Sequence, residues 1–480
     1  MNGRKGEIMT EQQPSNGYGQ NTKQRTAGDS LGQVQLPADA YYGAQTQRAV
    51  MNFPISGYRL PREFIKAQGI IKASAAAVHK DLGELDGGIA DAILAAADEV
   101  IEGRWDSQFV VDAFQAGAGT SQNMNANEVI ANVALEKLGL ERDRKDKIHP
   151  NDHVNKGQST NDTIPTAICI SLHESLERKV LPALEKLTNE LANKAREFHS
   201  VVKSGRTHLQ DAVPLRLGQE FEGYAATIGG MRKQLEGAAD GLLELGIGGN
   251  AVGTGVNNHP EYAARMVAEI GRRTGTPYRQ APSRFAFMQN PSAALRVSGL
   301  LRDAAVHLIK LSSDIRLLNS GPQTGLAEIR LPAVQPGSSI MPGKVNPVLP
   351  EMLYMVCCQV IGNDTAVRTA MIGSQLEINV MMPVIAHNVL QSAHILSTAA
   401  DAFCERCVKG IEADEEQCRY WMDRSLSLVT MLNPVIGYDK AADIAKESLK
   451  TQKPLRQLVV EKGILTEDEW EQIVRDSLSD

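Results

Sequence analysis

Apolar residues recur at steps of three and four over long stretches of the chain, which predicts long amphipathic helices. Between residues 180 and 198 the positions on this period are Val180, Leu184, Leu187, Leu191, Ala195 and Phe198. Between residues 301 and 318 they are Leu301, Ala305, Leu308, Leu311, Ile315 and Leu318. Strand alternation is scarce, and neither a βαβ rhythm nor a fixed-period repeat is present. From about Arg62 onward the pattern therefore predicts a mainly α-helical protein.

The first 30 residues carry almost no large apolar side chains and are rich in Gly, Gln, Asn and Thr. A segment of this kind cannot bury enough apolar surface to offset the loss of chain entropy on folding. We therefore expect residues 1–30 to form a disordered tail and the fold to begin near Leu31.

Between the predicted helices lie four polar stretches, rich in Gly or Asn, which carry more functional side chains than ordinary connectors do. They cover residues 117–127, 149–166, 205–219 and 337–351. Because loops and helix ends on a rigid scaffold commonly carry function, we expect a helical bundle with its chemistry in these stretches.

Composition narrows the class of protein. Hydrophobic residues make up 42% of the 480 residues, which excludes a mostly disordered chain, and the length predicts more than one domain. The net charge of −7 excludes the dense basic face of a general nucleic-acid binder. No apolar run approaches the roughly 18 residues that a membrane span needs. The N-terminal stretch lacks the apolar core of a secretory signal, so we expect a cytoplasmic protein with no membrane partner.

No metal or cofactor motif is present in the sequence. Cys404 and Cys407 are closely spaced, but no second pair follows, so we interpret them as packing residues on a helix. His149 and His153 lie four residues apart without a third ligand. Walker loops, dinucleotide fingerprints and nucleophile elbows are missing, and we expect neither a metal ion nor an organic cofactor.

The segment from Gly337 to Pro347 has the composition of an anion-binding loop. Glycines near both ends permit unusual backbone conformations, and many backbone N–H groups are free of bulky neighbours. Ser338 and Ser339 offer hydroxyls, Lys344 a positive charge and Asn346 an amide donor. A serine can act as a general base only where such donors stabilise its alkoxide. Two prolines favour a defined shape over a flexible surface loop.

The other three stretches supply more donors. Thr120 follows a Gly-rich turn before a predicted helix, where it could bind an anion or simply cap the helix. Ser159, Thr160 and Asn161 could hold a carboxylate or an amine, although the same stretch could serve as a helix cap. His208 lies beside Thr207 in a polar setting, which raises it above a structural histidine. Together these groups suit a small dicarboxylate that loses a proton next to one of its carboxylates.

Several long motifs, in one order along the chain, resemble those of the fumarase/aspartase superfamily. They are DAYYGAQTQRA, GAGTSQNMNANEVIAN, HPNDHVNKGQSTND, GRTHLQDAVPLRLGQEF, GGNAVGTGVN, GSSIMPGKVNP and LVTMLNPVIGYDKAADIAK. The resemblance implies an all-α (mainly), three-domain subunit: a tail (1–30), an N-terminal domain (31–158), a central helical bundle domain (159–412) and a small C-terminal helical domain (413–480). It also implies a homotetramer with a shared helical core and active sites that three subunits build together.

The same resemblance implies roles for individual residues in an anti elimination that yields fumarate. Ser338, on a mobile loop, would be the base and His208 the second catalytic residue, with Glu351 orienting His208. The groups that would bind substrate are Thr120, Ser159, Thr160, Asn161, Thr207, Ser339, Lys344 and Asn346.

The identity of the leaving group depends on smaller differences within the superfamily. Thr160, and Val348-Leu349 before Pro350-Glu351, are closer to aspartases, whereas GGNAVGTGVNNHPEYA and VIAHNVLQS are closer to class II fumarases. We expect an aspartate ammonia-lyase, a carbon–nitrogen lyase that forms fumarate from L-aspartate through an aci-carboxylate intermediate. The alternative is a class II fumarate hydratase, and a third possibility is a non-catalytic helical protein of this family.

Overall fold

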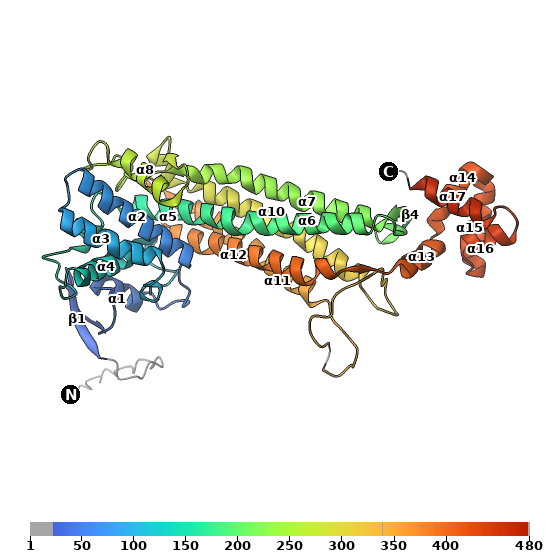
Figure 1. The fold of residues 1–480 in the computed structure, drawn as a ribbon, viewed down its shortest axis with the longest axis horizontal. Coiled ribbons are helices and arrows are strands. Elements are labelled where there is room, and N and C mark those ends of the chain that lie inside the picture. Colours follow the sequence, from blue (N-terminus) through green and yellow to red (C-terminus); the bar gives the residue numbers. More distant parts are fainter. Residues whose placement is uncertain (1–22, 338, 479–480) are drawn as a thin grey trace, which may run out of the picture.

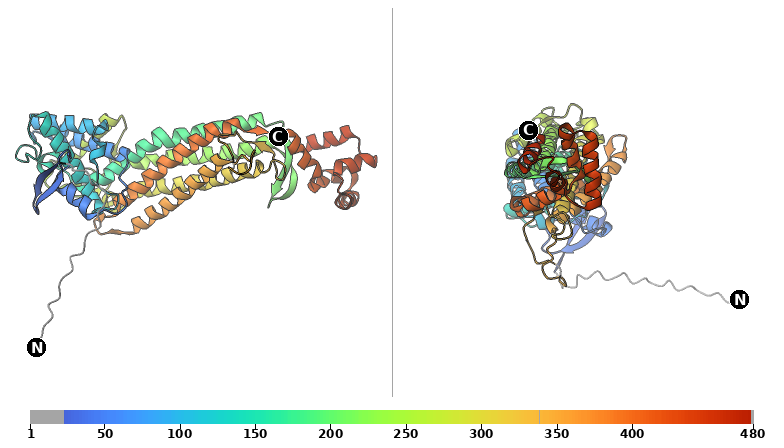
Figure 2. Two further views of the ribbon diagram at one scale, coloured as in Figure 1. Left: turned by 90° about the horizontal axis from the view of Figure 1, so that it is seen from below. Right: turned by 90° about the vertical axis from the view of Figure 1, so that its right-hand side faces the viewer.

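The structure, a computed structural model, describes residues 23–337 and 339–478. The molecule is elongated, with the N-terminal helices at one end, long helices in the middle and a group of C-terminal helices at the far end (Figures 1 and 2). Helices account for 64% of the chain, and the short strands pair two by two, which confirms the mainly α-helical prediction.

The elements fall into three regions. The N-terminal region contains β1 (Gln24–Asp29), β2 (Gly32–Pro37), α1 (Ala44–Asn52), α2 (Arg62–Asp81), α3 (Gly87–Ile101) and α4 (Thr120–Lys137). The bundle contains α5 (Thr160–Ser175), α6 (Leu181–Glu197), α7 (Leu217–Ala239), α10 (Ser292–Leu318), α11 (Val348–Ile372) and α12 (Met382–Arg406). The C-terminal region contains α13 (Glu415–Arg424), α14 (Val429–Ile436), α15 (Tyr438–Thr451), α16 (Leu455–Glu461) and α17 (Glu467–Ser477).

Short elements connect these helices. They are β3 (Val202–Thr207), β4 (Gln210–Arg216), β5 (Glu244–Leu245), α8 (Tyr262–Thr274), β6 (Arg279–Gln280), α9 (Arg284–Gln289), β7 (Ile329–Arg330), β8 (Ser374–Gln375), β9 (Ile378–Asn379) and β10 (Glu412–Ala413). The pairing of β7 with β10 is antiparallel and ties the start of the C-terminal region to the bundle.

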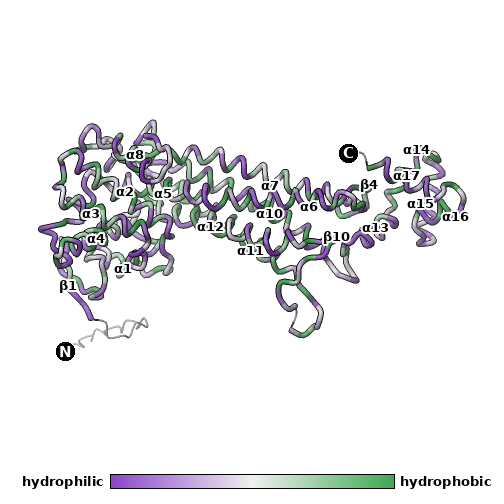
Figure 3. The backbone as a smooth tube through the Cα atoms, in the orientation of Figure 1, coloured by the Kyte–Doolittle hydropathy of each residue, from purple (hydrophilic) through white to green (hydrophobic). Residues whose placement is uncertain are grey.

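The bundle is held together by the apolar faces that the sequence pattern predicted. Helix α6 packs on α7 and α12, and α10 packs between α7 and α11. The periodic residues of α10 from Leu301 to Leu318 are all buried, as are Leu184, Leu187 and Leu191 of α6, so both predicted helices are confirmed. Along the long helices, hydrophobic and hydrophilic residues interleave (Figure 3), as expected where one face is buried.

Buried apolar side chains form three cores, one for each region. Helix α2 belongs to two of them, because Phe64 faces the bundle core and Ile65 the N-terminal core. The domain boundaries at 158/159 and 412/413 stay predictions. Cys404 in α12 and Cys407 at its C-terminal end are both buried, which confirms their interpretation as packing residues. Among the described residues, no helix combines the length and apolar character needed to cross a membrane.

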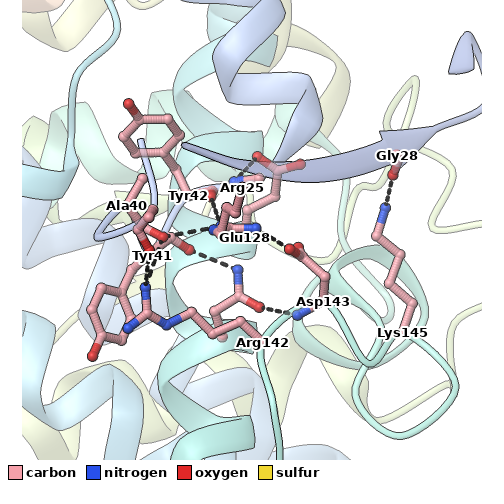
Figure 4. A network of polar contacts seen from close by, with 12 residues as sticks. Arg25, Gly28, Ala40, Tyr41, Tyr42, Glu128, Arg142, Asp143 and Lys145 are labelled. Atoms are coloured by element: carbon pink, nitrogen blue, oxygen red, sulfur yellow. Dashed lines mark hydrogen bonds and ion pairs between the residues drawn. The ribbon is translucent and has the colours of Figure 1, made fainter. Parts of the chain in front are cut away.

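The tail predicted for residues 1–30 is too long, because residues 24–29 form β1 and pair with β2. Arg25 anchors this strand through an ion pair with Asp143 and donates hydrogen bonds to the carbonyl oxygens of Ala40 (3.0 Å) and Tyr42 (2.7 Å) (Figure 4). These partners are remote in sequence and mostly backbone, so the hydrophobic pattern could not reveal them. Residues 1–22 lie outside the described residues.

Candidate active site

Two helix N-termini lie side by side and carry the first group of predicted site residues. Thr120 begins α4 and is exposed, and Thr160 begins α5. One turn into α4, Asn123 donates a hydrogen bond from Nδ2 to the Thr160 hydroxyl oxygen (3.3 Å). The positive ends of two helix dipoles favour an anion at this point. We call Thr120, Asn123, Ser159, Thr160 and Asn161 the α5 cluster.

Ser159 and Asn161 of the α5 cluster also have structural roles. Ser159 caps α5, since its hydroxyl accepts a hydrogen bond from Asn161 N (3.2 Å). The Asn161 side chain donates from Nδ2 to the carbonyl oxygen of Ala251 (2.7 Å). The two open alternatives, cap and anion site, are therefore compatible at Ser159, because the cap uses its hydroxyl oxygen as an acceptor and leaves its hydrogen to donate.

Asp162 completes the capping box of α5 and also holds a Gly-rich loop. It accepts a hydrogen bond from Ser159 N (2.9 Å), and its other oxygen accepts from Gly248 N (3.0 Å) and Asn250 N (2.8 Å). The motif around Gly248 thus serves to pack a loop against the start of α5. Burial raises the pKa of Asp162 to about 7, against the effect of these hydrogen bonds.

Lys72 of α2 contacts the α5 cluster through Asn123, although the sequence pattern did not indicate it. It is 1% exposed, and its Nζ donates hydrogen bonds to Asn123 Oδ1 (2.8 Å), Asn155 Oδ1 (2.8 Å) and Gln158 Oε1 (3.0 Å). Burial lowers the pKa of Lys72 to about 7, and its attraction to Asp162 acts in the opposite direction. A lone lysine within the apolar run GIIKASAAAV was the signal that could have revealed it.

The second group of predicted site residues lies at the tip of the β3–β4 hairpin. Thr207 and His208 are exposed there, and His208 and Leu209 adopt positive φ angles of 55° and 58°, as in a tight hairpin turn. Buried charges anchor the base of the hairpin: Lys203 Nζ lies 2.7 Å from Glu220 and 3.0 Å from Glu328. The tip is thus presented by a ribbon with a rigid base.

The third group lies on the connection between α10 and α11, which projects from the side of the bundle (Figure 1). Ser339, Lys344 and Asn346 are exposed on it, and Ser338 lies outside the described residues. A Cβ at Gly337 would lie 1.2 Å from the carbonyl oxygen of Lys344, so the two ends of this loop meet only because position 337 is glycine.

Glu351 lies in the first turn of α11, 3.9 Å from Arg316. Within the part of the chain that the structure describes, no hydrogen bond or ion pair joins it to His208. Its orienting role, like the roles of the other site residues, stays a prediction.

One chain does not bring the three groups together. Helices α5 and α6, joined by a π-helical turn (Leu176–Val180), form a rod of about 55 Å between Thr160 and the hairpin end. Helix α11 is about 37 Å long and separates the Lys344 loop from the α5 cluster. Its C-terminal end is near that cluster, because Val380, eight residues beyond α11, accepts a hydrogen bond from Ala118 N just before α4 (2.7 Å). A small dicarboxylate measures a few ångströms, so a single chain cannot surround it with all three groups.

Comparisons with known proteins identify the family. The Lyase family model matches residues 32–362, and the Fumarase C C-terminus model matches residues 428–476. A class II fumarate hydratase from Methylorubrum extorquens is 49% identical over 94% of this chain and 96% of its own length. One from Halobacterium salinarum is 52% identical over 93% of this chain and 94% of its own length.

The chain belongs to the fumarase/aspartase superfamily. A crystal structure of class II fumarase from Schistosoma mansoni has the same fold, with a TM-score of 0.89, 38% identity and coverage of 94% of this chain and 98% of that one. The protein is therefore a lyase of the fumarase/aspartase superfamily, as the motif resemblance implied.

The expectation of an aspartate ammonia-lyase is wrong. Most of the most similar curated relatives are class II fumarate hydratases, although an aspartate ammonia-lyase from a Bacillus species is 46% identical over 95% of this chain and 97% of its own length. The structure explains why Thr160 misled: it offers a hydroxyl oxygen to Asn123, which a serine would offer equally well. Val348 and Leu349 lie in the first turn of α11 beyond the loop, and their side chains carry no donor group.

The site residues of this superfamily member include no evident metal-ligand set. Among residues 23–337 and 339–478, no group of three or more His, Cys, Asp or Glu side chains could hold a metal ion. The side chains of the α5 cluster carry amides and hydroxyls, which bind carboxylates by hydrogen bonds.

Proposed function

We propose that this chain is a class II fumarate hydratase, a carbon–oxygen lyase that interconverts L-malate with fumarate and water. The observation that carries the proposal is the identity of 49% and 52% to class II fumarate hydratases over nearly the whole of both chains. The donors of the α5 cluster support it, because they suit a substrate with carboxylate groups and a hydroxyl.

In the proposed reaction, the Ser338 alkoxide removes a proton from the carbon next to one carboxylate of L-malate. The hydroxyl leaves from the adjacent carbon on the opposite face and takes up a proton from solvent to form water, and Ser338 then returns its proton to solvent. Ser339, Lys344 and Asn346 bind the carboxylate beside the proton that is lost and stabilise the negative charge of the aci-carboxylate. The other carboxylate and the leaving group are held by Thr120, Ser159, Thr160 and Asn161. Thr207 and His208 complete the pocket, with Glu351 orienting His208.

The proposal includes a homotetramer whose active sites are each shared between three subunits. The separation of the three groups by helix lengths of about 37 and 55 Å supports it. The outward face of α11 supports it as well, because it exposes Tyr354, Met355 and Ile372, which are 37%, 70% and 82% accessible in the single chain. Such a face is typical of a helix that packs on another copy. We also propose a cytoplasmic location.

The test is the ultraviolet absorbance of fumarate as purified protein acts on L-malate in one cuvette and on L-aspartate in another. We expect fumarate from L-malate alone. Fumarate from L-aspartate alone, or from neither substrate with a folded protein, would contradict the proposal. Ser338→Ala is expected to lower kcat roughly 100-fold or more if Ser338 is the base.

Shared sites are tested by mixing two inactive variants, Ser338→Ala and His208→Asn, and refolding them together. Some sites in the mixed assemblies then combine an intact Ser338 with an intact His208, so part of the activity is expected to return. A mixture as inactive as either variant alone would contradict sharing between subunits.

A further inference from the structure

The hydrogen bonds around Lys72 fix the orientation of Asn123. The ammonium group of a lysine only donates, so the amide oxygen of Asn123 must face it, at 2.8 Å. The Asn123 Nδ2 group then donates to the hydroxyl oxygen of Thr160 (3.3 Å) and to Asn155 Oδ1 (3.2 Å). The Thr163 hydroxyl also donates to Asn123 Oδ1 (3.4 Å), but the ammonium group of Lys72 makes the shorter contact with that oxygen (2.8 Å).

The same contacts fix the direction in which Thr160 can donate. Its hydroxyl oxygen already accepts from Asn123, so its hydrogen is free to point toward a ligand at the start of α5. Among the described residues, no protein acceptor takes this hydrogen. Lys72 therefore acts on the ligand site through Asn123 and Thr160.

The geometry also indicates that Lys72 is charged. Three amide oxygens lie within 3.0 Å of Nζ, and only the ammonium form has three hydrogens to give them. A neutral amine would turn its lone pair against one of these oxygens. Asp162, in the first turn of α5, is the acidic group that stabilises this cation from nearby, while its own two oxygens accept hydrogen bonds from backbone N–H groups.

We infer that Lys72 is a positioning residue that holds Thr160 as a hydrogen-bond donor and gives the α5 cluster its preference for a dianionic ligand. The inference deepens the proposed function and rests on the carboxylate site assigned there. The charge of Lys72 is separated from the ligand by the side chains of Asn123 and Thr160, a distance of about 10 Å. At an effective dielectric constant of about 20, a unit charge at this distance changes the affinity for an anion about ten-fold.

The test compares two ligands by isothermal titration calorimetry of the assembled protein: succinate, a dianion, and succinamate, which has the same carbon chain and a neutral amide at one end. Wild type is expected to prefer succinate. Lys72→Met is expected to weaken succinate binding about ten-fold and to reduce the preference, because the positive charge is lost. A purely structural lysine would affect both ligands alike.

Lys194→Met is the matched control. Lys194 is also buried, and it donates from Nζ to the carbonyl oxygen of Ile411 (2.8 Å) at the far end of α6, so its loss should leave the preference unchanged. Asn123→Asp serves as a second variant if Lys72→Met does not fold. Its carboxylate neutralises Lys72 and cannot donate to Thr160, so the preference should fall here too.

An unchanged preference in folded Lys72→Met, or in Asn123→Asp, overturns the inference, and so does a wild type that binds neither ligand. Turnover of L-malate is measured on the same samples. If wild type converts L-malate but Lys72→Met keeps the preference for succinate, only the role of Lys72 is contradicted. If wild type shows no turnover of L-malate but its preference for succinate is lost in Lys72→Met, only the proposed function is contradicted.

Discussion

Replacing Glu328 with Gln is expected to destabilise the protein by about 3–5 kcal/mol, because the change leaves buried charge without its partner. Glu328 is fully buried, 3.0 Å from Lys203 Nζ and 2.9 Å from a guanidinium nitrogen of Arg206. Glu220 lies 2.7 Å from Lys203 and balances one of the two cations. The four charges sum to zero in the wild type and to one positive charge in Glu328→Gln. Because the Lys203 side chain is only 2% exposed, water cannot compensate for this charge.

The assay is urea unfolding followed by circular dichroism, at one fixed protein concentration because an oligomer's stability depends on it. Glu412→Gln is the control, since Glu412 pairs with Arg330 at 3.8 Å on the exposed β7–β10 ribbon and its loss should cost less than about 0.5 kcal/mol. Adding Lys203→Met to Glu328→Gln restores the charge balance and should recover part of the loss. A decrease below about 1 kcal/mol for Glu328→Gln would refute the reasoning.

Two further predictions concern thiols and pH. Burial raises the pKa of the Cys169, Cys357, Cys407 and Cys418 thiols to about 12 and of Cys404 to about 11, while Cys358 is exposed on α11 in the single chain. In the proposed tetramer the α11 face is covered, so a thiol reagent should label no cysteine quickly in the native protein. After unfolding it should label all six. One fast-reacting thiol in the native protein would mean that the α11 face is uncovered. Burial lowers the pKa values of His173, His153 and His387 in the folded protein. The contribution of these neutral histidines to the free energy of unfolding should therefore be complete above the unfolded histidine pKa of about 6.5. It should decline as the pH falls from there toward the folded pKa values. His173→Gln should flatten this decline in thermal unfolding scans, and an identical slope would exclude His173 as a contributor.

The bundle could be predicted from the sequence because its helices are specified by a local repeat. The spacing of Leu301, Leu308 and Ile315 fixes a helical face, and that face needs only another apolar face to pack on. The strand β1 could not be predicted in this way, because Arg25 holds it through partners that lie up to 118 residues away along the chain. Long-range polar contacts leave no periodic trace in the sequence.

The candidate site could be predicted in part for a similar reason. Hydroxyl and amide groups in Gly-rich stretches indicate anion binding wherever they lie, so Thr160 and Lys344 could be singled out. Lys72 could not be placed at the site from periodicity, because it lies in an ordinary helix and its contact with Asn123 joins residues that are 51 positions apart in the sequence. The leaving group could not be predicted from Thr160, because a threonine and a serine offer the same hydroxyl there. Relatives that match over nearly the whole chain were the better guide.

The rod formed by α5 and α6 has a genetic consequence under the proposed assembly. Because its two ends are about 55 Å apart, the Thr160 and His208 of one polypeptide always serve different substrate molecules. In a cell that carries two alleles of the gene, damage at one end of a polypeptide removes one working pocket and leaves its other end useful to a neighbour. Two alleles that are each inactive alone could therefore sustain one another, provided that their defects lie at opposite ends of the rod.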